Sequence, residues 1–196
     1  MSDIVLTAGV RSNLLQLQQT ADLITSTQTK LATGKRVNTA LDNPINFFTA
    51  QGLTNRASDL GNLLDSMASG MSTIQAANNG LTSITKLVQS AQALVSQAQQ
   101  TSDTTVRSGL ATQFGAILTQ IDQLAGDSGF NGINLLDKNN SSDLTVTLNE
   151  TGTSSVTVSA VDFSSNGLSI SSANNNWNST TNIQGAADDL TAALTT

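Results

Sequence analysis

The sequence predicts a mainly α-helical protein with a small β-hairpin region, built as a long rod-like coiled-coil helical bundle. Two observations support this fold class. Apolar side chains recur in alternating steps of four and three in most of the chain before Gly126, which is typical of helices that pack lengthwise on other helices. Later the period changes to two in a pair of short segments, which indicates β-strands.

The first predicted helix occupies residues 1–33. Its apolar or small residues recur in steps of four and three and form a seam, meaning a stripe along one side of the helix. Polar Gln28 interrupts the seam at one position. The seam consists of Val10, Leu14, Leu17, Ala21, Ile24 and Leu31. Gly34 then supplies the left-handed conformation that commonly stops a helix.

A connecting joint over residues 34–43 follows. Lys35 and Arg36 lie just beyond the last carbonyl groups of the first helix, where cations interact favourably with the helix dipole. They could also form an anion site, but solvated dipole partners are the commoner case. The residues of the joint and of the next helix start are Gly34, Lys35, Arg36, Asn38, Asp42, Asn43 and Pro44. Asp42 and Asn43 are both N-cap residue types, and Pro44 fits the first helical position.

The second predicted helix runs from Pro44 to Gln100 and would be roughly 85 Å long if continuous. Its seam starts with Leu53, Ala57, Leu60, Leu64, Met67, Met71 and Ile74 and continues to Ala98. The step from Ile74 to Ala77 is three where the alternation needs four, and Asn78, Asn79 and Gly80 follow. This shift predicts a bend or a break in the helix.

The polar face of this helix carries few charges. Its charged residues are Arg56, Asp59, Asp65 and Lys86, and the other polar residues are amides and hydroxyls. Another chain can cover such a face without burying an unpaired charge, which favours repeated packing of identical copies. A plain helical bundle, or the low charge common in secreted proteins, would give the same pattern.

A third helix is predicted from Thr104 to Ala125, with Asp103 as N-cap and Gly126 as the stop. Its seam consists of Leu110, Phe114, Ile117, Ile121 and Leu124. Asn131 and Gly132, after Phe130, mark a tight turn.

The remainder of the chain changes character. Apolar and polar residues alternate in segments 143–150 and 155–163, which flank a turn at Gly152. This pattern predicts a β-hairpin. Trp177 lies in a polar loop, where packing under the loop is favoured over a role as a ligand platform. Ile183, Leu190 and their neighbours restart the seam of a final helix, which ends without a cap at Thr196.

Composition excludes several classes of function. The chain has no cysteine and no histidine, which excludes disulfides, imidazole catalysis and the usual zinc and copper sites. Carboxylates are scattered, and no phosphate-binding loop or nucleophile elbow is visible. The net charge of −6 argues against nucleic acid or an anionic membrane as the main partner. We therefore predict that the chain is not an enzyme and has no catalytic residues, no cofactor and no metal site.

The amino terminus carries Asp3 and lacks a cationic start followed by an apolar block, so it does not have the form of a cleaved secretory signal. No apolar run is long enough to cross a membrane. We expect a soluble protein without membrane insertion, whose export would use another route.

Two segments resemble bacterial flagellin. LATGKRVNTALDN (residues 31–43) resembles the family signature. The positions of that signature are, in order, Leu, two small residues, Gly, any residue, a basic residue, an aliphatic residue, Asn, a small residue, Ala, any residue, Asp, and finally Asp or Asn. SGFNGINLL (residues 128–136), which holds Phe130, Asn131 and Gly132, resembles the Phe-Asn-Gly segment. LTSITKLVQS (residues 81–90) sits where the family has its second rod helix. DNPINFF, followed by residues 56–60, is similar to the short flagellins of alphaproteobacteria.

The resemblance implies a structural subunit of the flagellar filament, self-assembling through coiled-coil helices for swimming motility. It implies secretion through the flagellar type III export apparatus into an extracellular filament, next to the filament cap and hook-associated proteins. The implied domains are an N-terminal filament-core helix (1–33), the joint (34–43), rod-domain helices with the first turn (44–136), a variable outward-facing β region (137–182) and the start of a truncated C-terminal rod helix (183–196).

Two departures from the family stand out. The chain lacks most of the C-terminal helical region, on which polymerisation and binding of the export chaperone depend in the family, so we expect a truncated product. Ser83 replaces the Arg of flagellins that the toll-like receptor detects, which predicts weak recognition. The alternatives to a filament subunit are a hook-filament junction protein, which shares the first signature, or a flagellin paralogue with a binding or adhesin role built on the hairpin.

Overall fold

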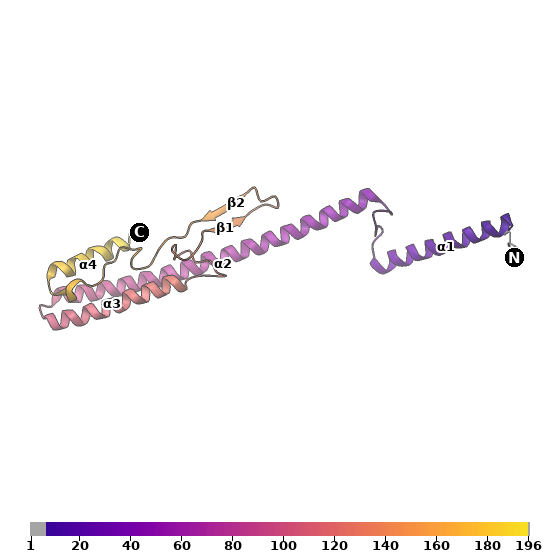
Figure 1. The fold of residues 1–196 in the computed structure, drawn as a ribbon. Helices are drawn as coiled ribbons and strands as arrows, with labels where there is room; N and C mark the ends of the chain where they lie inside the picture. Colours follow the sequence, from indigo (N-terminus) through magenta and orange to yellow (C-terminus); the bar gives the residue numbers. More distant parts are fainter. Residues whose placement is uncertain (1–6, 196) are drawn as a thin grey trace, which may run out of the picture. The chain divides into compact units, whose positions relative to one another are not determined.

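A computed structural model describes residues 7–195 of the chain. The helices are α1 (Ala8–Thr33), α2 (Pro44–Gln100), α3 (Thr104–Asp127) and α4 (Thr180–Ala193), the strands are β1 (Leu144–Thr147) and β2 (Ser155–Val158), and a short 3-10 turn, η1, covers Asn174–Trp177 (Figure 1). The predicted class, mainly helical with one small hairpin, is confirmed. The described residues divide after Asp59 into two compact units, which we call the N-terminal unit and the C-terminal unit.

The N-terminal unit contains α1, the joint and the start of α2. α1 begins at Ala8, so the part of the predicted helix over residues 1–6 lies outside the described residues. Gly34 ends α1 with a φ of 67°, as its place in the sequence predicts. The side-chain oxygen of Asn43 accepts a hydrogen bond from the backbone N–H of Asn46 at 3.0 Å, which caps α2.

Asp42 does not cap α2, which corrects one prediction. Its carboxylate accepts instead from the backbone N–H groups of Asn38 and Thr39, at 3.0 Å and 3.1 Å. Because Pro44 occupies the first helical position, Asn43 alone stands in register with the open N–H groups of the first turn. Asp42, one residue earlier, turns back and closes the joint.

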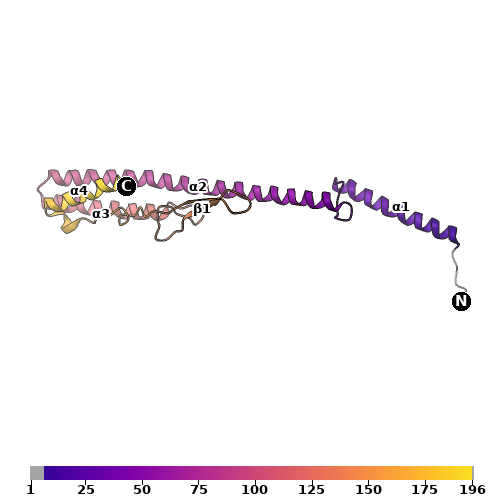
Figure 2. The same cartoon turned by 90° about the horizontal axis from the view of Figure 1, so that it is seen from above.

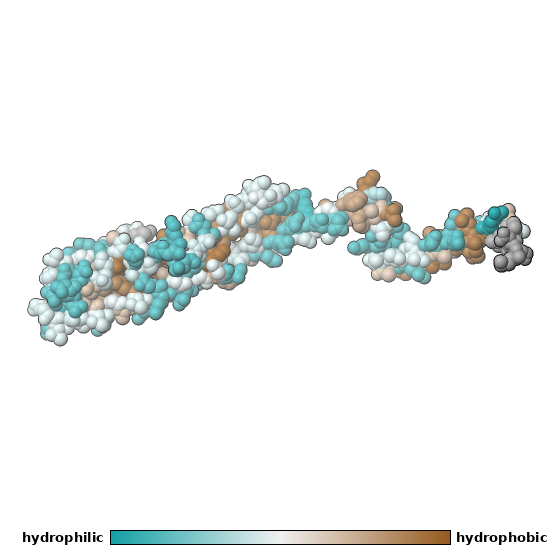
Figure 3. Space-filling view, in the orientation of Figure 1, coloured by the Kyte–Doolittle hydropathy of each residue, from teal (hydrophilic) through white to brown (hydrophobic). Residues whose placement is uncertain are grey.

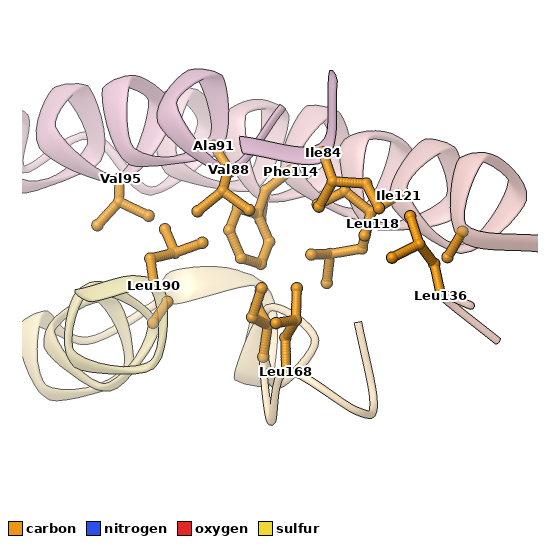
Figure 4. Packing of buried hydrophobic residues seen from close by; sticks show 14 of the residues in the cluster. Ile84, Val88, Ala91, Val95, Phe114, Leu118, Ile121, Leu136, Leu168 and Leu190 are labelled. Carbon is orange, nitrogen blue, oxygen red and sulfur yellow. The ribbon is translucent and has the colours of Figure 1, made fainter. Parts of the chain in front are cut away.

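The C-terminal unit is built around α2 from Leu60 onward. α3 runs back along α2, and α4 lies beside this pair (Figures 1 and 2). The buried side chains of Ala91, Phe114, Ile121 and Leu190 come from all three helices and point toward one another (Figure 4). Trp177 is fully buried as well, with its ring centroid 5.0 Å from that of Phe114. The tryptophan therefore packs under its loop, as predicted.

The buried stripe of α2 departs from the predicted seam before Ala77. The buried residues of the helix are Gly70, Thr73, Ala77, Gly80, Ile84, Val88, Ala91, Val95 and Ala98. Met71 and Ile74 of the predicted seam are exposed. The stripe uses small residues here because other segments approach the helix closely: a Cβ on Gly70 would lie 2.6 Å from Cγ2 of Val146 in β1.

The predicted break at Asn78, Asn79 and Gly80 does not occur, because α2 is continuous through these residues. Gly80 serves packing instead. A Cβ at this position would clash with the hydroxyl oxygen of Ser128 and lie 2.9 Å from Cδ1 of Leu136. The missing side chain lets the end of α3 and the following turn approach α2.

α3 begins as predicted, since the Asp103 carboxylate accepts from the N–H groups of Thr105 and Val106. It does not stop at Gly126, and this prediction is corrected: the helix ends at Asp127 with no left-handed residue. The Asn134 amide donates to the carbonyl groups of Ala125 and Gly126 at 2.6 Å and 2.8 Å. A side chain from beyond the helix thus satisfies carbonyls that a glycine cap would otherwise serve.

The predicted hairpin is confirmed with shorter strands. β1 and β2 pair antiparallel with Thr145 opposite Thr157, and Gly152 in the turn has a φ of 70°. The segment after β2 leaves this ladder, because the N–H groups of Val161 and Phe163 donate to the carbonyl groups of residues 135 and 136. The final helix, predicted from residue 183, begins three residues earlier because the Ser179 side chain caps it.

Candidate assembly surface and helix joint

The most unusual surface of the N-terminal unit is α1, in which none of the described residues is buried. The predicted seam is exposed along its length, from Val10 at 48% to Leu31 at 84%. Brown apolar atoms are visible along this helix in Figure 3. An apolar stripe of this kind needs a partner surface, because it gains stability only when it is removed from water.

α1 has a second apolar side, which the periodic pattern did not predict. Leu15 and Leu23 are 57% and 68% exposed. At about 100° per residue they lie across the helix from the seam that contains Leu17 and Ile24. They are eight residues apart with polar Gln19 between them, so they do not form a pattern of steps of three and four. A helix that is apolar on two sides is suited to burial among several others.

α2 carries exposed apolar residues in both units. The predicted seam residues Leu53, Leu60, Leu64, Met71 and Ile74 are exposed, and Met67 is half-buried. Ile45 and Phe48 near the start of the helix, and Leu41 in the joint, are exposed too and were not predicted as surface contacts. The stretch INFF (residues 45–48), in which three of four residues are apolar, could have indicated Ile45 and Phe48.

The joint is held by hydrogen bonds between its own residues. The Thr33 hydroxyl lies 2.7 Å from the side-chain oxygen of Asn38, and the Asn38 amide donates to the Lys35 carbonyl at 3.3 Å. Together with the Asp42 carboxylate these contacts fix the chain between the two helices. Lys35 and Arg36 are both exposed and line an open groove with Phe47. Their role as solvated charge stays a prediction.

Asp42 makes the joint sensitive to acid. The pKa of its carboxyl group lies below the ordinary value of 3.8, chiefly because the backbone N–H groups of Asn38 and Thr39 donate to the charged form. The folded joint therefore favours the carboxylate. Its stabilising contribution is complete above the unfolded pKa and is lost as pH falls through the lowered folded pKa.

We expect an NMR titration, read at the amide protons of Asn38 and Thr39, to give a midpoint below 3.8. The same titration of the chain in denaturant is the control, since unfolding releases both hydrogen bonds. A folded-state midpoint equal to or above that of the denatured chain would contradict the assignment.

The predicted turn at Phe130, Asn131 and Gly132 is present. Phe130 and Ile133 exchange both backbone hydrogen bonds, at 2.9 Å and 3.0 Å. Asn131 and Gly132 have φ values of 51° and 82° between them, which is the pattern of a primed tight turn. The turn places Asn134 against the end of α3, and so fixes the helix end next to Gly80.

The described residues contain no group of three or more carboxylates placed to hold a metal ion, and none of their helices is apolar over a length that spans a bilayer. The geometry combines a set of exposed apolar helix faces with a joint held by its own hydrogen bonds. Such features support association between helices.

Comparison with known proteins points the same way. Residues 7–141 match the family model described as the bacterial flagellin N-terminal helical region. The chain is 29% identical over 171 residues to flagellin FljK of Caulobacter vibrioides, covering 87% of this chain and 62% of that protein. It is 27% identical over 173 residues to the flagellin of Escherichia coli, covering 88% of this chain and 34% of that protein. The chain thus spans less than two thirds of the length of these relatives.

The fold agrees with a solved structure. The crystal structure of Bacillus cereus flagellin is similar with a TM-score of 0.58 at 21% identity, over 68% of this chain and 76% of that one. The family match spans more than half of the chain and contains the joint and the turn at Asn131. This chain therefore belongs to the flagellin family and carries its N-terminal helical region.

Proposed function

We propose that this chain is a non-catalytic structural subunit of the bacterial flagellar filament, which associates with other flagellin subunits through its helices. The observation that carries the proposal is the exposure of apolar side chains on two sides of α1. Burying a leucine side chain contributes about 1.5–3 kcal/mol, so a helix with this many exposed apolar residues favours a packed assembly over free solution.

The exposed seam residues of α2, which are Leu53, Leu60, Leu64, Met71 and Ile74, offer the same kind of surface. Few charges interrupt it, and a face of amides and hydroxyls can be covered at little electrostatic cost. On this proposal the chain acts in the extracellular filament, passes through the flagellar type III export apparatus, and meets the filament cap and hook-associated proteins. Membership of a structural protein family supports the absence of catalysis.

Co-sedimentation with flagellin filaments tests the proposal. Purified chain is mixed with FljK monomers and filament seeds, and the pellet is analysed for both proteins. We expect the chain to enter the pellet. Leu17→Asp should reduce its incorporation by more than about tenfold, because the interface would bury an unpaired charge.

Gln18→Asp is the matched control for that experiment. It introduces the same charge one residue away, on a polar side of α1, and should incorporate like the wild type. Both variants should unfold within about 0.5 kcal/mol of the wild type, since neither side chain is buried in the free chain. Absence of the wild-type chain from the pellet, or equal loss with both variants, would contradict the proposal.

The joint provides a second functional prediction. Gly34→Val should impair co-assembly more than Lys35→Gln. Valine is strained at a φ of 67°, whereas the Lys35 side chain is exposed and its replacement by glutamine removes only the charge. Motility of a strain that depends on the variant protein would show the same order. The reverse order would overturn the view that the joint acts through its geometry.

A further inference from the structure

The chain contains Asn-Gly pairs at Asn79-Gly80, Asn131-Gly132 and Asn166-Gly167. Asparagine followed by glycine is the pair most prone to spontaneous deamidation, because glycine has no Cβ to hinder ring closure. We propose that Asn131 is a site of deamidation and isoaspartate formation in the folded protein, and that the structure protects the other two pairs.

The reaction needs only water. The backbone nitrogen of Gly132 loses its proton and attacks the side-chain carbonyl carbon, Cγ, of Asn131. A new C–N bond forms, the bond from Cγ to the amide nitrogen breaks, and ammonia leaves. Water then opens the resulting five-membered succinimide ring at one of its two carbonyl groups. One opening gives aspartate, and the other gives isoaspartate, in which the main chain runs through Cβ.

The turn lets the Gly132 nitrogen reach the Asn131 side chain after one local rotation. With φ of 51° and 82° the turn is of type I′, in which ψ of Asn131 is about +30° and the Gly132 nitrogen points away from the side chain. A flip of the peptide plane between Asn131 and Gly132 gives the other primed type, with ψ of about −120°, which brings the nitrogen to Cγ and keeps the hydrogen bonds between Phe130 and Ile133.

Asn131 and Gly132 are both exposed, and a Cβ built on Gly132 would meet no atom within 4 Å. The hydrogen bonds of the turn use the N–H groups of Phe130 and Ile133. Within residues 7–195 the Gly132 N–H has no acceptor, and the Asn131 side chain makes no hydrogen bond that would hold it away.

The other pairs lack this freedom. Gly80 is buried inside α2, where its nitrogen belongs to the intrahelical ladder and Ser128 packs against its Cα. Gly167 donates its N–H to the Ser164 hydroxyl at 3.1 Å, and Asp162 fills the space beside it. Ring closure at either pair first requires local opening of the structure.

Modification at Asn131 would change more than the turn. Isoaspartate adds one methylene to the main chain between Phe130 and Ile133, which changes the spacing that their paired hydrogen bonds require. Asn134, the amide that satisfies the last carbonyls of α3, follows directly. We therefore expect the isoaspartate form to loosen the end of α3 at its contact with Gly80.

Peptide mapping by mass spectrometry tests the proposal on the full chain. The protein is held at mildly alkaline pH, and deamidation at each pair is followed with time. In the native protein we expect product at Asn131 at least about tenfold faster than at Asn166, and about a hundredfold faster than at Asn79, because these two wait for local opening. In denaturant the rates at all three pairs should converge. A native rate at Asn131 equal to or below that at either other pair would overturn the proposal.

Asn131→Asp is the matched control for the structural effect, because it adds the charge and keeps the normal main chain. It should unfold at the wild-type temperature, while protein enriched in isoaspartate at position 131 should unfold at a lower one. Equal melting temperatures of the isoaspartate form and the wild type would refute the predicted loosening of α3.

Discussion

Gly80→Ala is expected to destabilise the C-terminal unit by about 1–3 kcal/mol, the usual cost of forcing extra volume into a packed site. The added Cβ would lie 2.6 Å from Cβ of Ser128 and 2.9 Å from Cδ1 of Leu136. Ser128 cannot easily move, because its hydroxyl donates to the Leu124 carbonyl at 2.5 Å. The end of α3 would have to separate from α2, and urea unfolding followed by circular dichroism measures the loss.

Gly61→Ala separates packing from helix propensity. Gly61 lies in the same helix, and a Cβ there would meet no atom within 4 Å. Alanine is a better helix former than glycine, so this variant should be more stable than the wild type by up to about 1 kcal/mol. The two substitutions are chemically identical and should act in opposite directions. A stabilising effect of Gly80→Ala equal to that of Gly61→Ala would show that the close approach of Ser128 is not important.

These glycines also show where sequence reasoning ends. The start of α2 was predicted because Asn43 and Pro44 are local signals that act within one turn. Gly80 was interpreted as a helix breaker since the same local reasoning assigns glycine to breaks. Its actual role depends on Ser128, a residue far along the chain, and no local pattern contains that contact.

The end of α3 illustrates the same limit. Gly126 has the residue type of a stop, but the helix continues because Asn134 satisfies its last carbonyls from outside. For the assembly surface, the seam containing Leu17 was visible as a period, whereas Leu15 and Leu23 were too widely spaced to form one. The presence of the helices was thus predictable from periodicity. How closely they approach depends on residues far apart in the chain, and the width of the exposed surface depends on residues outside the periodic pattern.

Phe114→Ala is expected to cost the C-terminal unit about 3–5 kcal/mol, since the ring is fully buried and its loss leaves a cavity. Phe114 contacts Trp177, the single tryptophan of the chain, so fluorescence reports the change directly. We expect an earlier unfolding midpoint in urea and a native emission spectrum that indicates greater exposure of the indole to water.

Phe48→Ala is the matched control, because it removes the same ring from a position that is 64% exposed in the N-terminal unit. It should change the free energy of unfolding by less than about 1 kcal/mol and leave the Trp177 emission unchanged. If the exposed apolar residues of the N-terminal unit serve assembly, Phe48→Ala should lower incorporation into filaments although the free chain stays folded. Phe114→Ala should lower incorporation only to the extent that it unfolds the chain. Equal unfolding midpoints for the two variants would contradict the assignment of Phe114 to the core and Phe48 to the surface.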